Sequence, residues 1–350
     1  MNDLDILEGL VASAVANPSG EDVASSPTPD LHQYDRILVM MSGKDSLACL
    51  LHLIELGAPL GRIELHHHDV DGRHAEPEST LMDWPCTHGY IVALGKAFGV
   101  PVLFSHRAGG IEREMLRENC GSAPIVYTKA NGDLVTLASD RCKQSTRLKF
   151  PQVSASLITR WCSSAAKISV SDRLLIHDER FRKGRTLVVT GERAEESANR
   201  ARYAEFEPHR ADNRHGRIPR HIDAWRAVHR WTRQQVWQII ARHRCMAHPA
   251  YYVGAGRASC MKCVFNSSNA WATIRVVDPA GFAVIASYEQ RFGVTIHRTR
   301  SVTAQANRGT PYAFEERWRA IAMSREFTQP IFIDPWVMPI GAFGESCGPT

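Results

Sequence analysis

The chain has 350 residues, 44% of them hydrophobic, which is ample apolar material for a sizeable core in one or two domains. Its nine cysteines are too sparse for a disulfide scaffold and odd in number, so we expect reduced thiols or metal ligands. No run approaches the roughly 20 apolar residues that span a bilayer, and the N-terminus is acidic where a signal peptide is basic. With a net charge of +5, the composition predicts a cytoplasmic globular protein without a membrane partner.

Residues 1–30 combine a short apolar patch with Pro- and Ser-rich stretches and are predicted to form a flexible tail. Beyond them, apolar runs alternate with helical periodicity. Strands are predicted at 36–41, 62–68, 100–105 and 185–190, and helices at 46–56, 85–98, 154–164 and 232–243. This alternation predicts an α/β fold with a doubly wound, mainly parallel sheet. Residues 108–150 lack periodicity and suggest an insertion or lid, and residues 271–350 a mostly helical extension with a mobile tail.

The turn after the first predicted strand reads Ser42-Gly43-Lys44-Asp45-Ser46. A strand that runs through small residues into a helix places free N–H groups and a helix dipole at one spot, which favours anion binding. Gly43 permits close approach, the two serines can donate hydrogen bonds, and Lys44 adds charge. Asp45 would repel phosphate unless it holds the loop or a Mg²⁺ ion. An ordinary strand-to-helix turn is the alternative, and the spacing is not that of a Walker A loop.

Two arginines follow the strand predicted to end near Thr190. Arg193 and Arg200 would reach the same sheet edge as the turn, because ligands of open parallel sheets collect at the carboxyl ends of the strands. Their planar guanidinium groups suit phosphate or sulfate oxygens. Glu192 and Glu196 could hold these arginines or a Mg²⁺ ion. A solvated, charged helix face is the alternative.

A basic stretch covers residues 200–233, with nine arginines among four aromatic residues, Tyr203, Phe206, Trp225 and Trp231. Phosphate contacts and base stacking could make this stretch a nucleic-acid surface. Acidic residues are interleaved with the arginines, however, and a solvated surface of mixed charge is the competing interpretation.

Four segments in order resemble a known family. The turn resembles the Ser-Gly-Gly-x-Asp-Ser signature of PP-loop nucleotide enzymes, with Ser42 at the first Gly and Met41 at the first Ser. Residues 160–167 resemble a Cys-Cys-x-x-x-Lys element, residues 190–200 a Gly-x-Arg-x-x-Glu-Ser-x-x-Arg element, and residues 248–263 a C-terminal cysteine element. The chain therefore resembles the phosphoadenosine phosphosulfate (PAPS) reductase family of the PP-loop superfamily, including members from DNA-phosphorothioation and CRISPR-type defence loci.

The resemblance implies a PP-loop, Rossmann-like nucleotide-binding domain over residues 31–270. The residues that it implies for nucleotide binding are Met40, Met41, Ser42, Gly43, Lys44, Asp45, Ser46, His67, Asp69, Arg160, Lys167, Gly191, Glu192, Arg193, Glu196, Arg200 and Arg257. It implies catalytic roles for Lys44, Asp45, Arg193 and Cys347.

The leading hypothesis from this resemblance is an ATP- and Mg²⁺-dependent enzyme. It would cleave ATP between the α- and β-phosphates and adenylate an acceptor, for sulfur transfer from a sulfur donor. A thioredoxin-dependent PAPS or adenylyl-sulfate reductase is the first alternative, and a nucleotide-binding accessory subunit of a nucleic-acid defence complex is the second. The sequence does not decide whether the protein forms a homodimer.

The cysteines carry a further expectation from the family. Cys162, Cys260 and Cys263 stand where the family holds a [4Fe–4S] cluster, and Ser163 replaces the fourth ligand. Three thiolates would leave one iron open, or Cys142 could fill the gap; plain buried thiols are the alternative. Cys347 resembles the mobile nucleophile on the C-terminal tail of the family. A free cysteine without a role is the alternative.

Overall fold

The computed structural model describes residues 28–72, 80–138, 143–154, 156–258 and 260–345. Within these ranges eight strands form one sheet in the order β5-β4-β3-β2-β1-β6-β8-β7. The strands are β1 (Arg36–Met41), β2 (Ile63–Asp69), β3 (Val102–Arg107), β4 (Ile125–Thr128), β5 (Leu134–Leu137), β6 (Arg185–Val189), β7 (Phe206–Pro208) and β8 (His221–Trp225). The five central strands are parallel, and β4, β5 and β7 join antiparallel at the edges. The predicted doubly wound, mainly parallel α/β fold is confirmed.

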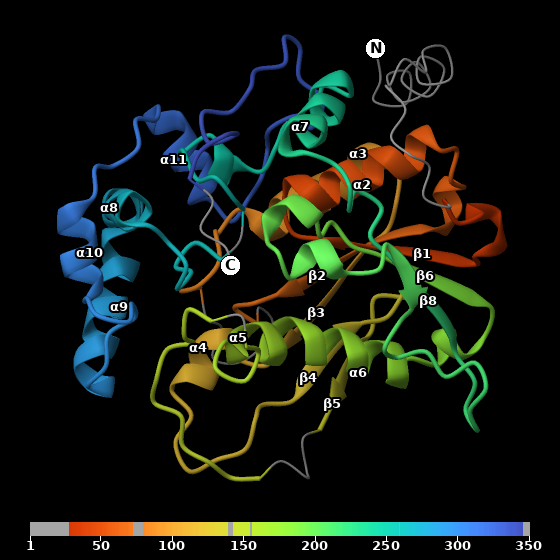
Figure 1. Cartoon of the computed structure of the whole chain (residues 1–350), viewed down its shortest axis with the longest axis horizontal. Helices are drawn as coiled ribbons and strands as arrows, with labels where there is room; N and C mark the ends of the chain where they lie inside the picture. Colours follow the sequence, from red (N-terminus) through yellow and green to blue (C-terminus); the bar gives the residue numbers. More distant parts are fainter. Residues whose placement is uncertain (1–27, 73–79, 139–142, 155, 259, 346–350) are drawn as a thin grey trace.

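Helices cover both faces of this sheet, as Figure 1 shows. One face carries α2 (Lys44–Glu55), α3 (Thr87–Phe98) and α7 (Arg233–Arg242), and the other carries α4 (Gly110–Met115), α5 (Trp161–Ser163) and α6 (Ser169–His177). The alternation of β1 explains the two layers, because Ile37 and Val39 enter the core under α2 whereas Leu38 enters the core under α6. The predicted N-cap of α7 is confirmed, since Thr232 Oγ1 accepts from the Gln235 N–H at 3.2 Å.

The predicted helix at 154–164 is wrong in position. The helical segment begins at Trp161, passes through a π-helical turn at Ser164–Ile168 and continues as α6. Before it, the Ser154 and Ser156 hydroxyls accept hydrogen bonds from the N–H groups of Ser156 and Ile158, at 3.1 and 3.3 Å. Such local bonds compete with helical hydrogen bonding, which explains why this serine-rich segment forms turns.

The segment 108–150, predicted to be an insertion or lid, contributes α4, β4 and β5 to the structure. The antiparallel pairs β3–β4 and β4–β5 extend the sheet at this edge. Residues 139–142 of the segment, with Cys142, lie outside the described residues.

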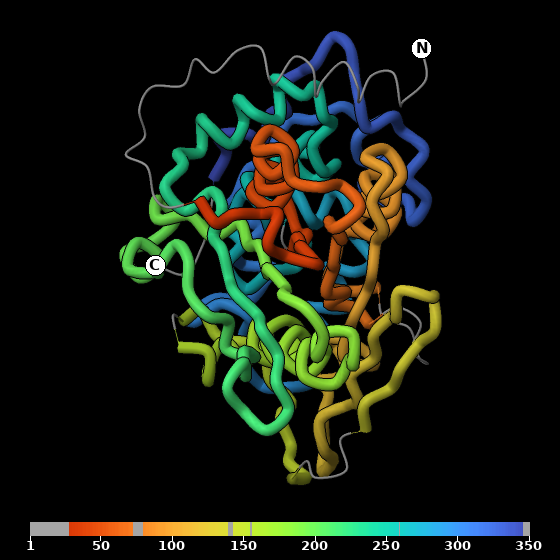
Figure 2. Tube along the Cα trace, turned by 90° about the vertical axis from the view of Figure 1, so that its right-hand side faces the viewer, coloured from red at the N-terminus to blue at the C-terminus, as the bar shows by residue number. Residues whose placement is uncertain are grey.

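The C-terminal part is mostly helical, as predicted. It consists of α8 (Ser268–Val277), α9 (Pro279–Phe292), α10 (Val302–Arg308) and α11 (Glu316–Ala322), which lie at one end of the sheet in Figure 1 and mostly behind it in Figure 2. Trp84, Trp161, Trp271 and Phe282 share one apolar cluster that joins this part to the sheet domain. In the described portion of the chain, no helix is both long and apolar enough to cross a membrane.

Most of the predicted N-terminal tail, residues 1–27, and the last five residues of the predicted C-terminal tail lie outside the described residues. The stretch before residue 346 is fastened to the domain. The Gly341 N–H donates to the Tyr251 carbonyl at 2.8 Å, and Trp237 Nε1 donates to the Ala342 carbonyl at 2.8 Å.

Candidate functional site

A cavity of about 690 Å³ opens at the carboxyl ends of β1, β2, β6 and β8. The chain proceeds from β1 to β2 and β3 on one side, whereas β6 and β8 lie on the other, so strand order reverses between β1 and β6. Open α/β sheets bind ligands at such a reversal, and the cavity has the volume of a ligand pocket. Of the described residues implied in nucleotide binding, all but Asp69 line this cavity.

Asp69 is the exception. It is 2% exposed at the end of β2, where its Oδ1 accepts the Asp71 N–H at 3.0 Å, so it holds the loop after the strand. Cys347, the predicted nucleophile, lies outside the described residues.

Residues 42–46, which we call the phosphate turn after the ligand predicted for them, join β1 directly to α2, as predicted. The Ser46 hydroxyl accepts hydrogen bonds from the Ser42 and Gly43 N–H groups at 2.8 and 3.0 Å. The Lys44 N–H donates to the Tyr251 hydroxyl at 3.1 Å. Three N–H groups at the N-terminus of α2 are therefore held by two protein hydroxyls in this structure.

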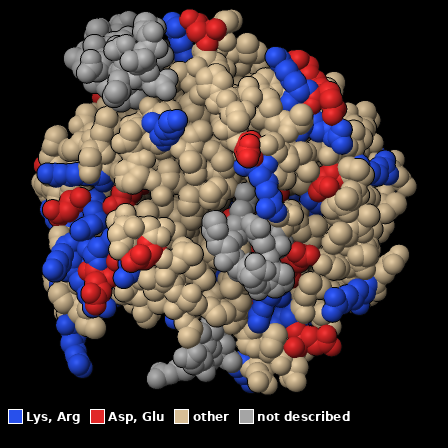
Figure 3. Space-filling model, turned by 180° about the vertical axis from the view of Figure 1, so that it is seen from behind, with Lys and Arg blue, Asp and Glu red and all other residues tan. Residues whose placement is uncertain are grey.

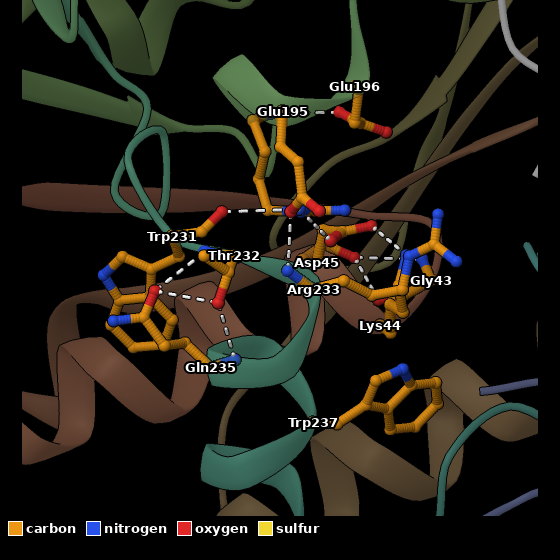
Figure 4. A network of polar contacts seen from close by, with 12 residues as sticks. Gly43, Lys44, Asp45, Glu195, Glu196, Trp231, Thr232, Arg233, Gln235 and Trp237 are labelled. Carbon is orange, nitrogen blue, oxygen red and sulfur yellow. Dashed lines mark hydrogen bonds and ion pairs between the residues drawn. The ribbon is translucent and has the colours of Figure 1, made fainter. Parts of the chain in front are cut away.

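Asp45 lies between two cations. Its carboxylate contacts Lys44 Nζ at 2.8 Å and Arg193 Nε at 2.6 Å, and Arg193 Nη1 contacts Glu195 at 2.6 Å. Figure 4 shows Asp45, Lys44 and Glu195 together in this network. Burial alone would raise the pKa of Asp45, but the charges of Lys44 and Arg193 outweigh it and hold that pKa below its usual value. We call Lys44, Asp45, Arg193 and Glu195 the turn wall.

The turn wall changes the interpretation of Arg193, which was predicted to face an anion. Its side chain is 3% exposed, and it binds Asp45, Glu195 and the Trp231 carbonyl. Arg193 lines the cavity, but its guanidinium is committed to carboxylates. Its role in this structure is to hold Asp45 and, through it, the phosphate turn.

Gly191 allows this contact between distant segments. A Cβ at this position would lie 2.7 Å from the Asp45 carbonyl carbon and 2.8 Å from the Ser46 nitrogen, so only glycine fits. The two nearby glutamates hold arginines. Glu196 pairs with Arg200, and Glu192 pairs with Arg226 at 2.9 Å rather than with Arg193 or Arg200.

The opposite side of the cavity carries cations of a different kind. Arg160 lies at the N-cap of α5, and its Nε and Nη1 atoms are buried without a hydrogen-bond partner among the described residues. Lys167 lies in the π-helical turn and pairs with no carboxylate in the described part of the chain. Burial lowers the pKa of Arg160, and the charge of Arg200 lowers it further, against the opposite influence of Cys162. We call Arg160 and Lys167 the open wall.

Cys162, Cys260 and Cys263 also line the cavity. Burial raises the pKa values of the Cys162 and Cys260 thiols, and Lys167 opposes this shift in both. Across the described ranges, no group of three or more His, Cys, Asp or Glu side chains is arranged to hold a metal ion. As arranged, these thiols do not form a cluster site, and a cluster held by them stays a prediction.

The basic stretch 200–233 is largely paired within itself and with its neighbours. Arg226 contacts Glu207 at 2.8 Å, Arg214 contacts Asp212 at 2.9 Å, and Arg230 contacts Glu205 at 3.1 Å. Figure 3 shows basic and acidic side chains intermixed over the face opposite to that of Figure 1. The nucleic-acid surface stays a prediction.

Several cavity residues were not among the predicted site residues. Tyr251 holds the Lys44 N–H, whereas its place in the sequence predicted only that it belongs to the segment 248–263. His66, His68, Tyr203, Phe265 and Arg233 also line the cavity. The run of three histidines in the sequence was the signal that could have indicated His66 and His68. Only the sheet register shows which of these histidines share a face.

Comparison with known proteins finds a similarity in sequence to a phage protein. No protein-family model matches the chain. Over 288 residues it is 28% identical to a protein of Escherichia phage 186 described as an uncharacterized 37.8 kDa protein in the gpa 5′ region, which covers 76% of this chain and 77% of that protein. The similarity therefore extends over most of both chains, and the description of the phage protein names no activity.

Proposed function

We propose that the protein is a PP-loop-type enzyme of the PAPS reductase family that binds ATP in the cavity between the turn wall and the open wall. An acceptor nucleophile attacks the α-phosphorus, pyrophosphate leaves, and the acceptor carries AMP until sulfur or another nucleophile displaces it. Mg²⁺ would be coordinated by the nucleotide phosphates rather than by protein carboxylates, because Asp45, Glu192 and Glu196 are already paired with cations.

The observation that carries this proposal is a pair of unmatched cations in a cavity at the strand-order reversal. Nine Lys or Arg residues and six Asp or Glu residues line the cavity, an excess of three positive charges. A buried guanidinium without a partner is costly unless a ligand supplies the anion. A polyphosphate meets that requirement, and the phosphate turn offers a second contact at the N-terminus of α2.

Each wall has a separate task in this proposal. Asp45 and Arg193 keep the phosphate turn in place, and Lys44 balances the charge of Asp45 at that end of the cavity. Arg160 and Lys167 attract the anionic groups on the other side. Cations placed before the reaction stabilise the charge that develops on the leaving pyrophosphate without reorganisation.

The direct test is calorimetric titration of the full chain with ATP and Mg²⁺, followed by an assay for pyrophosphate with and without added thiol or amine acceptors. We expect Lys44→Met to weaken ATP binding at least about tenfold, because it leaves the Asp45 carboxylate with one cation fewer at the end of the cavity where the phosphates bind. Lys129→Met, at an exposed position on the β4–β5 turn, is the matched control and should bind as the wild type does. Absence of ATP binding by the wild type would reject the proposal, whereas binding without pyrophosphate release would favour the accessory subunit.

One observation favours the PAPS reductase alternative. Glu345 is held by Asn269 Nδ2 at 2.8 Å and by the Tyr312 hydroxyl at 3.1 Å. Its backbone runs against Gly256, which lines the cavity; a Cβ on Gly256 would lie 2.2 Å from the Glu345 carbonyl oxygen. Cys347 follows Glu345 by two residues, and two residues of extended chain span at most about 7 Å.

In this alternative, the Cys347 thiolate attacks the sulfonyl sulfur of PAPS and displaces adenosine 3′,5′-bisphosphate, and reduced thioredoxin then releases sulfite. Incubation with PAPS and reduced thioredoxin should yield sulfite, and Cys347→Ser should abolish it. No sulfite from the wild type would remove this alternative.

A further inference from the structure

Three polar side chains form a row on the α6 face of the sheet, at the floor of the cavity. The Ser105 hydroxyl lies 2.9 Å from His66 Nε2 and 2.7 Å from His68 Nδ1. Residues 66 and 68 share a face because strand side chains alternate, and the parallel register places His68 beside Ser105. Both histidines line the cavity.

The single hydroxyl hydrogen gives this row a direction. Ser105 can donate to one imidazole only and must accept an N–H from the other. His66 is fully buried, and its Nδ1 has no partner among the described residues. If Ser105 donated to His66 Nε2, the hydrogen of His66 would sit on Nδ1 as a buried N–H without a partner. If His66 Nε2–H donates to Ser105 instead, Nδ1 carries only an unused lone pair. Buried N–H groups without a partner are rarer and more costly than unused lone pairs. The row therefore runs from His66 Nε2–H to Ser105, and from the Ser105 hydroxyl to His68 Nδ1.

We propose that this row fixes His68 as its Nε2–H tautomer, so that His68 donates a hydrogen bond into the cavity beside Lys167 and the two form a binding site for a tetrahedral oxyanion, phosphate or sulfate. The site lies on the opposite face of the sheet from α2. It lies in the same cavity and shares Lys167 with the open wall, and His68 is the residue that belongs to the oxyanion site alone.

The electrostatic surroundings support an anionic ligand. Burial, with the charges of His67 and Lys167, lowers the pKa of His68 to about 3, and burial lowers the pKa of His66 well below its usual value. Both imidazoles are therefore neutral at pH 7, and Lys167 supplies the positive charge. An imidazole N–H and an ammonium group are both donors, so the pair selects an acceptor with negative charge.

The tautomer can be observed directly by ¹⁵N NMR of the full chain at neutral pH. His68→Gln identifies the His68 resonances by their loss. We expect the Nε2 of His68 to resonate as a protonated nitrogen and its Nδ1 as an unprotonated one, and Ser105→Ala to leave a mixture of tautomers. A His68 protonated at Nδ1 would make its Nε2 an acceptor and would overturn the proposal.

Oxyanion binding is measured by titrating the same protein with inorganic phosphate and, separately, with sulfate. Loss of one charge-assisted hydrogen bond should weaken binding about tenfold in His68→Leu and in Lys167→Met. His68→Gln keeps an N–H donor near the Nε2 position and should stay within about threefold of the wild type, and the exposed Lys129→Met should not differ. Equal binding by His68→Leu and the wild type, or no binding of either anion, would overturn the site.

The two proposals can fail separately. Anion binding that depends on His68, in a protein that does not bind ATP, would keep this site and reject the nucleotide site. ATP binding with no response to His68→Leu in the anion titrations would do the reverse.

Discussion

The two walls of the cavity use their cations in opposite ways. On the turn wall, Arg193 and Lys44 meet Asp45 at 2.6 and 2.8 Å, so their charges are neutralised inside the protein. On the open wall, Arg160 has two buried guanidinium nitrogens, Nε and Nη1, without a partner in the described residues. A cation that lines a cavity is therefore not always available to a ligand. Whether such a cation can bind a ligand depends on whether a carboxylate of the protein is already paired with it.

The largest expected effect is on the turn wall. Asp45→Asn removes the carboxylate that Lys44 and Arg193 share, which leaves the buried Lys44 without its carboxylate partner and Arg193 with Glu195 alone. Because breaking a buried ion pair on one side is strongly destabilising, we expect the free energy of unfolding at pH 7 to fall by about 3 kcal/mol. Urea denaturation measures this, with Asp133→Asn on an exposed turn as the control. A loss below about 1 kcal/mol would contradict the structural role given to Asp45.

The same variant carries a pH dependence. The folded-state pKa of Asp45 is held below its usual value, so its ionised form contributes stability above the unfolded pKa of about 3.9. That contribution is lost as the pH falls through the folded pKa. The difference in stability between the wild type and Asp45→Asn should therefore be full at pH 7 and shrink in titrations below about pH 4. A difference that stays constant to lower pH would place its cause elsewhere.

An intermediate effect is expected on the open wall, and in a different measurement. Arg160→Met should weaken ATP binding about tenfold, because one phosphate contact is lost, and should leave the free energy of unfolding unchanged or raised. The physical reason is that an unpartnered buried guanidinium costs stability, whereas methionine fills similar space without that cost. Calorimetry and urea denaturation of one preparation give both values. A destabilisation of more than about 1 kcal/mol would show that Arg160 has a structural partner.

The smallest effect is expected outside both walls. Arg230 is about half exposed and pairs with Glu205 at 3.1 Å on the surface. Arg230→Gln should change the free energy of unfolding by less than about 0.5 kcal/mol and leave ATP binding unaltered, because exposed ion pairs contribute little. Binding of a single-stranded oligonucleotide at two salt concentrations completes the test. A salt-sensitive loss of oligonucleotide binding in this variant would support the nucleic-acid surface.

Much of the framework was predictable because it depends on local signals. The apolar run of β1, the helical spacing of α2 and the capping residue Thr232 of α7 each depend on neighbouring residues only. Parallel strands joined by helices then place the phosphate turn and the residues after β6 at one sheet edge. Local pattern failed at 154–164, where serine hydroxyls favour turns over the helix that the composition suggested.

The chemistry of the site was less predictable because it depends on pairing at long range. Asp45 and Arg193 are 148 residues apart, and nothing in either segment indicates that one neutralises the other. The His66–Ser105–His68 row likewise requires the register of β2 against β3. The sequence indicated which residues reach the cavity, whereas their partners were visible only in three dimensions.

The hydroxyl groups that occupy the phosphate turn have a consequence for the heat of ligand binding. Because Ser46 and Tyr251 already accept hydrogen bonds from three N–H groups, a phosphate that enters the turn exchanges these bonds rather than adding new ones. The enthalpy gained at this end of the cavity is therefore small. Most of the favourable enthalpy of binding should arise instead where Arg160 and Lys167 acquire their first anionic partner.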